Sequence, residues 1–352
     1  MNTHTHFAAA GIETLQSWFN PRTALWESTG WWNSANILWV LLDYSARRNT
    51  TLYHQVAADI FAHHQRGNFL NEYYDDEGWW ALTWIKAYDV TNDPRYLTMA
   101  CTIFADMCSG WDPFCGGGIW WRKDRTYKNA IANELFFSLA ASLSRHIPDP
   151  QEQAPYLEWA HLAWNWFAQS GLINPSFLIN DGLDAHCYNN GGITWTYNQG
   201  VVLAGLVDMT ALTGNSAYLH TAEAIANATI TTLVDRQGIL HEPCEPNCGN
   251  DGPQFKGIFV RNLAYLYEAD HYEPYRQFIL RNSAAITQKS RSLHYHFGLN
   301  WSAPVDVADA ARQSSALDAL NAAMSLAPAE EPDEICNPSA TPDITDHPTQ
   351  DL

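Results

Sequence analysis

The feature that most restricts the fold is a regular alternation of two kinds of apolar segment along almost the whole chain. Segments of the first kind carry apolar residues on one face only, which is typical of a surface helix. Segments of the second kind are apolar nearly all round, so a helix formed by them must be buried. The amphipathic segments lie at 7–19, 52–66, 95–108, 155–169, 217–234 and 272–288, and the apolar segments begin at 31, 79, 128, 194, 255 and 309.

Six buried helices alternating with six surface helices predict a repeated helical hairpin that closes into an all-α (α/α)6 toroid, with one domain over residues 1–326. Asn-containing turns at 90–97 and 212–219 join a buried helix to the next surface helix. The long loops 109–127, 171–193 and 238–254 precede buried helices, so we expect them to line a cleft at one end of the ring. The sequence shows no convincing strand pattern beyond short hairpin-like pieces such as residues 116–127.

The charge of the chain restricts its partners. It has 38 acidic and 19 basic residues and a net charge of −19, which disfavours nucleic acid and anionic membranes and favours a neutral substrate. We expect no transmembrane segment and a monomer. Residues 1–19 contain no secretory leader, so the chain as written is cytoplasmic, or extracellular if a leader has been removed. Residues 327–352 are acidic and Pro-rich, which predicts a disordered tail.

The seven cysteines leave two alternatives open. Cys101 and Cys108 lie seven residues apart on a predicted helix, which is too far for a disulfide. Cys244 and Cys248 are close enough to pair, and they fit two free thiols equally well. Only His241 lies near them, so a zinc site lacks ligands, and we expect neither a metal nor a cofactor.

The sequence YYDDEGWW at positions 73–80 places Asp75 and Asp76 among four large aromatic residues at the start of a buried helix. Adjacent residues can hold two carboxyl groups about 5 Å apart, which is the separation in a retaining glycosidase. Like charge and burial raise one pKa, while the helix N-terminus favours the ionised partner. One acid and one nucleophile can therefore arise from the same residue type. The alternative is that an aspartate simply caps the helix.

Polar and aromatic residues in and before the other buried segments are candidates for sugar binding, since aromatic rings stack on sugars and amides bind hydroxyls. Each amide has the alternative role of satisfying loop backbone in the core. Asp184, with Asp181, is a weaker catalytic alternative that also fits a turn and a cap. The candidate substrate-binding residues are Asn33, Asn36, Tyr74, Trp79, Trp120, Trp121, Asn129, Asn133, Asp181, Trp195, Asn198, Phe255 and Arg261.

Several motifs together, including YYDDEGWWALTW, TYKNAIANELFF, NNGGITWTYNQG and DGPQFKGIFVRN, resemble glycoside hydrolase family 76, the endo-α-1,6-mannanases. The resemblance covers roughly residues 10–326. It implies an (α/α)6 fold and a retaining mechanism, with Asp75 as nucleophile and Asp76 as acid/base. The implied substrate is the α-1,6-mannose backbone of mannan.

Other activities fit the same residues. Fungal members of the family are thought to be transglycosidases of the cell wall that use the same pair. A non-catalytic glycan-binding protein is a third reading, disfavoured because both aspartates are present. Epimerases and zinc-dependent cyclases also use six-hairpin toroids, but the sequence shows no set of zinc ligands.

Overall fold

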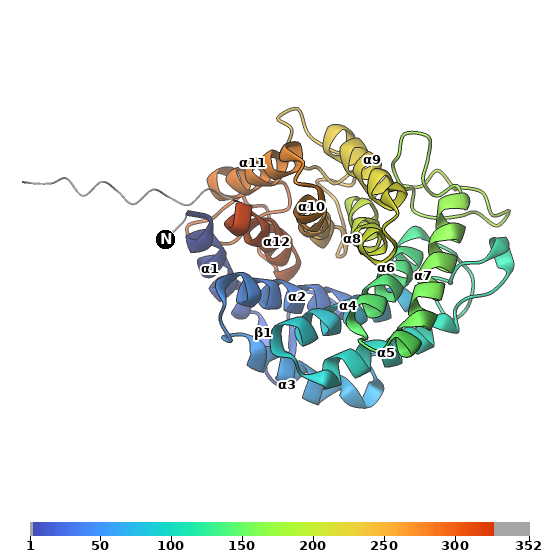
Figure 1. The fold of residues 1–352 in the computed structure, drawn as a ribbon. Coiled ribbons are helices and arrows are strands. Elements are labelled where there is room, and N and C mark those ends of the chain that lie inside the picture. The colour runs from blue at the N-terminus through green and yellow to red at the C-terminus, as the bar shows by residue number, and fades with distance from the viewer. Residues whose placement is uncertain (1–2, 327–352) are drawn as a thin grey trace, which may run out of the picture.

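A computed structural model describes residues 3–326, and these form twelve α-helices arranged as a ring within a ring (Figure 1). The predicted tail at 327–352 lies outside the described residues. The inner helices are α2 (Trp31–Arg48), α4 (Tyr74–Thr91), α6 (Ala130–His146), α8 (Thr196–Thr213), α10 (Phe255–Asp270) and α12 (Ala310–Leu326). The outer helices are α1 (Thr3–Gln16), α3 (His54–His64), α5 (Pro94–Cys108), α7 (Pro150–Gln169), α9 (Ser216–Thr232) and α11 (Glu273–Lys289).

The inner ring is closed by contact between its first and last members. Each inner helix packs on the next in chain order, α12 packs on α2, and α1 packs on α12. The inner helices are buried nearly all round, with fully buried Trp80, Phe136 and Phe259 among their largest side chains. The predicted alternation of six buried and six surface helices is therefore confirmed.

The two ends of the ring differ in their connections. An inner helix passes to the next outer helix through short links such as 92–93 and 214–215. The inner helices α6, α8 and α10 follow the long predicted loops, and a further long loop, 290–309, precedes α12. The hairpin-like segment 116–127 contains no strand: it takes part in isolated bridges, such as Trp111 with Ile119, follows the single-turn helix η2 (Phe114–Gly116), and turns back so that the N–H of Trp121 donates to the carbonyl of Tyr127 at 2.8 Å. The remaining elements are β1 (Phe19–Asn20), β2 (Leu25–Trp26), η1 (Gln65–Gly67) and η3 (Gly252–Gln254).

A repeated side-chain contact fixes these loops to the inner ring. The fourth residue of α8, Gln199, accepts the N–H of Ile179 at 2.8 Å and donates to its carbonyl at 2.9 Å. The fourth residue of α6, Asn133, binds the N–H and carbonyl of Ile119 in the same way, at 2.7 and 2.9 Å. Gln313, fourth in α12, accepts the N–H of Phe297. Buried loop backbone is thereby satisfied without a sheet.

Two buried lysines and two disulfides add further restraints. Lys128 donates to the carbonyls of Phe114, Gly117 and Gly118 at 2.7 to 2.9 Å, and thus holds the loop before α6. Lys256 holds the loops before α10 and α12 through similar bonds. A disulfide between Cys115 and Cys187, which the sequence did not reveal, joins two loops, and Cys244 pairs with Cys248. Cys101 and Cys108 are free, as predicted.

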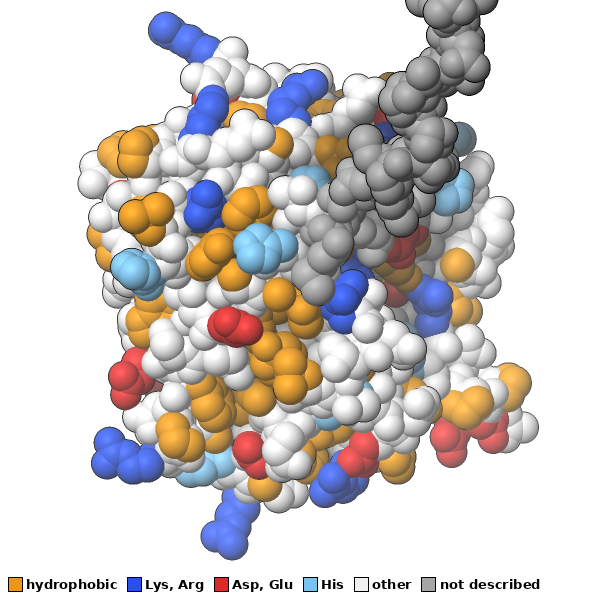
Figure 2. Space-filling view, turned by 90° about the vertical axis from the view of Figure 1, so that its left-hand side faces the viewer, with side chains coloured by type: hydrophobic (Ala, Val, Ile, Leu, Met, Phe, Trp, Pro, Cys, Tyr) orange, Lys and Arg blue, Asp and Glu red, His pale blue; other side chains and the backbone are white. Residues whose placement is uncertain are grey.

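The outer surface follows from helices that bury only one face. Figure 2 shows hydrophobic side chains in small groups among polar and charged ones on one side of the ring. No helix within residues 3–326 has the length and apolar character needed to cross a membrane.

The bonds of Gln199 lead to a stability prediction. Gln199→Leu leaves the N–H and carbonyl of Ile179 buried without partners, so we expect a loss of about 2–4 kcal/mol in the free energy of unfolding. The control is Gln277→Leu on the exposed face of α11, where Gln277 reaches only Glu273, and which should change stability by less than about 0.5 kcal/mol. Urea unfolding measures both. Equal effects of the two substitutions would contradict the role assigned to Gln199.

Candidate active site

The two adjacent aspartates lie in the first turn of α4. The helix begins at Tyr74, five residues earlier than the sequence pattern indicated, and its N-cap is Tyr73, which makes no side-chain cap bond. Neither aspartate therefore caps the helix. As second and third residues, Asp75 and Asp76 face the positive end of the helix dipole, which stabilises a carboxylate by about 0.3–1 kcal/mol.

Each aspartate has one side-chain donor from a preceding or neighbouring loop. Oδ2 of Asp75 accepts the indole N–H of Trp121 at 3.0 Å, and Oδ2 of Asp76 accepts the amide of Asn71 at 2.6 Å. Oδ1 of Asp75 is buried and has no hydrogen-bond partner among the described residues. An oxygen of that kind is available to a bound ligand.

Burial dominates the electrostatics of the pair. It raises the pKa of Asp75 well above its ordinary value, and the charge of Asp76 adds to the rise, whereas the N–H of Trp121 opposes it. Burial also raises the pKa of Asp76 to about 6; the amide of Asn71 lowers this pKa, and the charge of Asp251 raises it. Burial therefore disfavours the ionised form of both carboxyl groups.

An aromatic cluster, made of Trp32, Trp79, Trp195, Tyr197 and Phe255, lies at the same end of the inner ring. Tyr197 stacks on Phe255 with ring centres 3.8 Å apart and on Trp79 at 6.3 Å. Trp79 also stacks on Trp32, and Phe255 contacts the ring of Trp195. The rings come from helices α2, α4, α8 and α10, and Trp195 is the N-cap residue of α8. Together they form one aromatic surface, which suits stacking on a sugar.

Further carboxyl groups surround this cluster. Burial raises the pKa of Tyr197 well above its ordinary value, and the charges of Asp181, Asp75, Glu134 and Asp251 add to the rise. Asp181 accepts the hydroxyl of Tyr127 at 2.5 Å and the indole N–H of Trp195 at 3.0 Å. It is therefore held next to the cluster. Asp184 is exposed and accepts loop N–H groups, which lower its pKa.

Several predicted site residues have their polar atoms bound to protein instead. Asn133 is saturated by Ile119 and Asn129, and Asn129 caps α6. Asn33 accepts the N–H of Gly30 and donates to Gln254. For these three asparagines, the alternative of satisfying backbone and core polar groups matches the contacts observed.

Three other predicted residues face away from the pair. The hydroxyl of Tyr74 reaches Ser109 on the outer side of α4. Trp120 is buried, with its indole N–H on Asp112. Arg261 binds Asn36 at 2.6 Å and contacts Asp318, farther along the barrel axis. Trp79, Trp121, Asp181, Trp195 and Phe255 are the predicted residues that lie together with the pair or the aromatic cluster.

Sequence reasoning missed Asn71, Glu134, Asp251, Trp32 and Tyr197. Glu134 is fully buried on α6 and neither of its carboxyl oxygens has a partner among the described residues, nor has the amide of the candidate residue Asn198. Burial raises the pKa of Glu134 well above its ordinary value. A lone Glu in an otherwise apolar segment was a visible signal. Asn71 and Asp251 lie in loops, where the sequence gives no such contrast.

The site shows no metal-binding arrangement. Within residues 3–326 there is no group of three or more His, Cys, Asp or Glu side chains placed to hold a metal ion.

Comparison with known protein families identifies the family of this chain. The profile of glycosyl hydrolase family 76 matches residues 12–333. The chain belongs to this family. A putative mannan endo-1,6-alpha-mannosidase of Schizosaccharomyces pombe is 28% identical over 270 residues, covering 70% of this chain and 59% of that protein. Mannan endo-1,6-alpha-mannosidase DCW1 of Saccharomyces cerevisiae is 29% identical over 260 residues, covering 68% and 56%. The family 76 chain thus spans less than two thirds of the length of these relatives.

Solved structures confirm the toroid. The alpha-1,6-mannanase GH76A of Salegentibacter sp. HEL1_6 has a TM-score of 0.82 at 24% identity, covering 92% of this chain and all of that one. An inactive variant of it, with two adjacent aspartates changed to alanine, was solved with alpha-1,6-mannotetrose and has the same TM-score at 23% identity over 92% and 99% of the two chains. Dfg5 of Chaetomium thermophilum, solved with glucosamine, has a TM-score of 0.80 at 19% identity over 91% and 90%. These likenesses show an (α/α)6 fold for the family 76 chain.

The pKa of Asp76 leads to a prediction for folding. Its folded pKa of about 6 lies above the ordinary 3.8, so ionising it in the folded state opposes folding at neutral pH. Asp76→Asn keeps an acceptor for Asn71 and removes that penalty. We expect it to exceed the parent in stability by roughly 1–3 kcal/mol near pH 7, with the difference fading as the pH falls below about 4.

Urea unfolding across this pH range measures the effect. Asp184→Asn is the control, and its effect on stability should have the opposite sign. Backbone N–H groups lower the pKa of Asp184, so loss of this carboxylate should reduce stability near neutral pH. An Asp76→Asn variant that is less stable than the parent near pH 7 would contradict the electrostatic account.

The bond from Trp121 leads to a second prediction. Trp121→Phe removes the only side-chain donor to Asp75 and should raise the pKa of this carboxyl further. If Asp75 must be ionised, the acid limb of the kcat/KM profile should move up by about one pH unit. Trp120→Phe, which breaks a bond to Asp112, should lower stability without moving that limb. A shift of the basic limb alone would give Asp75 the acid role.

Proposed function

We propose that this family 76 protein is a retaining endo-α-1,6-mannosidase that cleaves the α-1,6-mannose backbone of mannan. The observation that carries the proposal is the pair Asp75 and Asp76, adjacent in the first turn of α4, both with raised pKa and both beside an aromatic cluster. A retaining glycosidase needs two neighbouring carboxyl groups, one ionised as the nucleophile and one protonated as the acid.

The relatives support this choice of substrate. Curated relatives from two yeasts carry the name mannan endo-1,6-alpha-mannosidase. Two variants of the Salegentibacter enzyme, each with a substituted pair of adjacent aspartates, are described as inactive and were solved with alpha-1,6-mannotetrose and alpha-1,6-mannotriose. A neutral manno-oligosaccharide also suits a chain with a net charge of −19.

We assign Asp75 as the nucleophile and Asp76 as the acid/base. In the first step Asp76 gives its proton to the glycosidic oxygen while the carboxylate of Asp75 attacks the anomeric carbon and displaces that oxygen. In the second step Asp76 takes a proton from water, and the water oxygen displaces Asp75. Two displacements at one carbon retain the configuration.

This assignment requires the substrate to favour the ionised form of Asp75. In the free protein the pKa of Asp75 is raised well above that of an ordinary carboxyl, and that of Asp76 is about 6. The positive charge that develops on the sugar lies next to the nucleophile and favours its ionised form. The N–H of Trp121 acts in the same direction. Glu134 and Asn198 add buried polar groups, without a partner among the described residues, beside the aromatic cluster.

The direct test is digestion of debranched α-1,6-mannan followed by product sizing. The proposal predicts a ladder of shorter oligosaccharides, whose new reducing ends first appear in the α configuration. Products longer than the substrate, formed when an acceptor oligosaccharide is added, would indicate a transglycosidase that uses the same pair. No cleavage by the intact protein would exclude the proposed activity.

Separate variants test the two roles. Asp75→Asn and Asp76→Asn should each lower turnover by several orders of magnitude while the fold is kept. On an activated aryl mannoside, which needs no proton for departure, azide should rescue Asp76→Ala with retained configuration. Azide on Asp75→Ala should give the opposite anomer. Exchanged outcomes would exchange the roles, and near-normal activity of either Asn variant would move the assignment to Asp181 or Asp184.

A further inference from the structure

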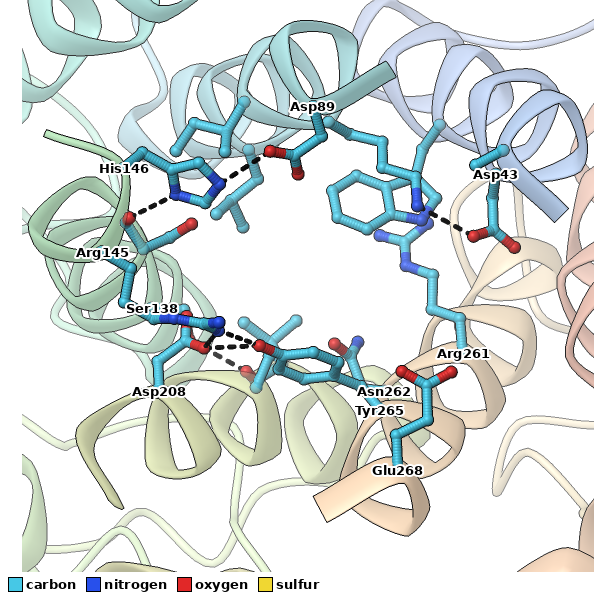
Figure 3. Close-up of a pocket in the computed structure, with 18 of the residues that line it drawn as sticks. Asp43, Asp89, Ser138, Arg145, His146, Asp208, Arg261, Asn262, Tyr265 and Glu268 are labelled. Atoms are coloured by element: carbon cyan, nitrogen blue, oxygen red, sulfur yellow. Dashed lines mark hydrogen bonds and ion pairs between the residues drawn. The ribbon is translucent and has the colours of Figure 1, made fainter. Parts of the chain in front are cut away.

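A cavity of about 630 Å³ lies on the barrel axis at the end opposite to the aspartate pair (Figure 3). Its charged lining comes from the C-terminal turns of the inner helices, such as Arg47 of α2, Asp89 of α4, His146 of α6 and Glu268 of α10. Trp79 lines its inner end and stacks with Trp32 of the aromatic cluster. Trp79 is therefore shared by the cavity wall and the aromatic cluster, whereas neither Asp75 nor Asp76 lines the cavity.

The charged groups of the cavity are paired with one another. Buried Asp43 binds Arg47 at 2.7 Å and Lys86 at 2.9 Å. On the other side of the cavity in Figure 3, buried Asp208 accepts the hydroxyl of Tyr265 at 2.6 Å and an N–H of Arg145. Four permanent cations and four carboxylates line the cavity, so their formal charges cancel. The cations are Arg47, Lys86, Arg145 and Arg261, and the anions are Asp43, Asp89, Asp208 and Glu268.

These pairs do not use all of their hydrogen-bonding capacity. Lys86 has three N–H groups; among the described residues its ammonium has one hydrogen-bond partner, Asp43, and it also lies 5.5 Å from the centre of the Trp39 ring. Arg145 donates hydrogen bonds from only one of its two terminal nitrogens. The carboxylate of Glu268 lies 3.9 Å from Arg47, which is too far for a hydrogen bond. Between these groups the wall is apolar, with Leu82, Ile85, Val201 and Ala204. Donors, acceptors and apolar surface therefore alternate around one space.

We propose that this axial cavity binds a neutral, polyhydroxylated ligand the size of one or two hexose rings. A hydroxyl both donates and accepts, so it can bridge the unused N–H groups and carboxylate oxygens without changing the balance of charge. The C–H faces of a sugar fit the apolar wall, and the volume is within the range of small-ligand sites. An anion would find each deep cation already paired with a carboxylate: Arg47 and Lys86 share Asp43, Arg145 binds Asp208, and Arg261 faces Asp318.

Methyl NMR can locate the ligand, because Ile85 and Val201 are buried in the wall of this cavity. The protein carries Asp75→Asn with Asp76→Asn so that no probe is cleaved, and the probe is α-1,6-mannobiose. We expect saturable shifts of both methyl signals with a Kd on the order of 1 mM. Inorganic phosphate should neither produce these shifts nor compete with the sugar.

Substitutions in the cavity then test the assignment. Ala204→Phe should abolish the shifts by filling the space, and Lys86→Met should weaken binding at least tenfold while Asp43 keeps Arg47. Arg66→Gln removes a charge from an exposed position of η1 and should leave the affinity unchanged. Melting temperatures establish that each variant is folded; if Ala204→Phe is not, Lys86→Met decides alone.

Three results would overturn the proposal: no saturable shift of either methyl group, affinity unchanged by Lys86→Met, or displacement of the sugar by phosphate. Because binding is measured in a catalytically inactive protein, the outcome does not depend on the proposed mannanase activity. A chain that fails to cleave mannan but binds mannobiose at Ile85 and Val201 would refute the proposed function and leave this inference standing.

Discussion

The structure depends on one contact that recurs in the inner ring: a polar residue at the fourth position of an inner helix holds the backbone of the loop before it. Asn133, Gln199 and Gln313 each accept a backbone N–H of the preceding loop with the oxygen of the side-chain amide. In α4 the same position is Glu77, which accepts the N–H of Asn71 at 3.1 Å. Asn71 in turn binds Asp76, so the device that fixes the loops also places the acid/base of the proposed reaction.

That construction forces a conflict between folding and chemistry. The carboxyl groups of Asp75, Asp76 and Glu77 stand in one helical turn, and burial raises the pKa of all three. Glu77 is compensated by Lys123 at 2.8 Å, whereas the described residues give Asp75 and Asp76 no cation. Their ionised forms are therefore unfavourable in the free protein. In a glycosidase mechanism the sugar develops positive charge in the transition state. That charge would stabilise the ionised aspartate, for which the protein provides no cation, so the interaction would be stronger in the transition state than in the free protein.

The ring could be predicted from the sequence because burial on all sides leaves a compositional mark on each inner helix, and six such helices admit few arrangements. The proposed catalytic pair was visible because two charges stood among four aromatic residues. The sequence could not show which amides bind protein groups and which remain without a partner. Asn133 binds a loop residue, Ile119, whereas the amide of Asn198 has no partner among the described residues, although both stand in similar local sequence. The disulfide between Cys115 and Cys187 was missed for the same reason: it joins two loops whose paths depend on the whole ring.

The inner helices present two chemically distinct surfaces along a single axis. On α4 the residues Asp75, Trp79, Lys86 and Asp89 follow one another from the proposed catalytic end to the axial cavity. Trp79 separates the two, with Trp32 and Tyr197 stacked on the catalytic side and the guanidinium of Arg261 5.9 Å from its ring on the other. Arg261 is therefore better understood as part of the cavity wall than as a contact of the mannan chain. Trp79 therefore belongs both to the aromatic cluster and to the wall of the axial cavity.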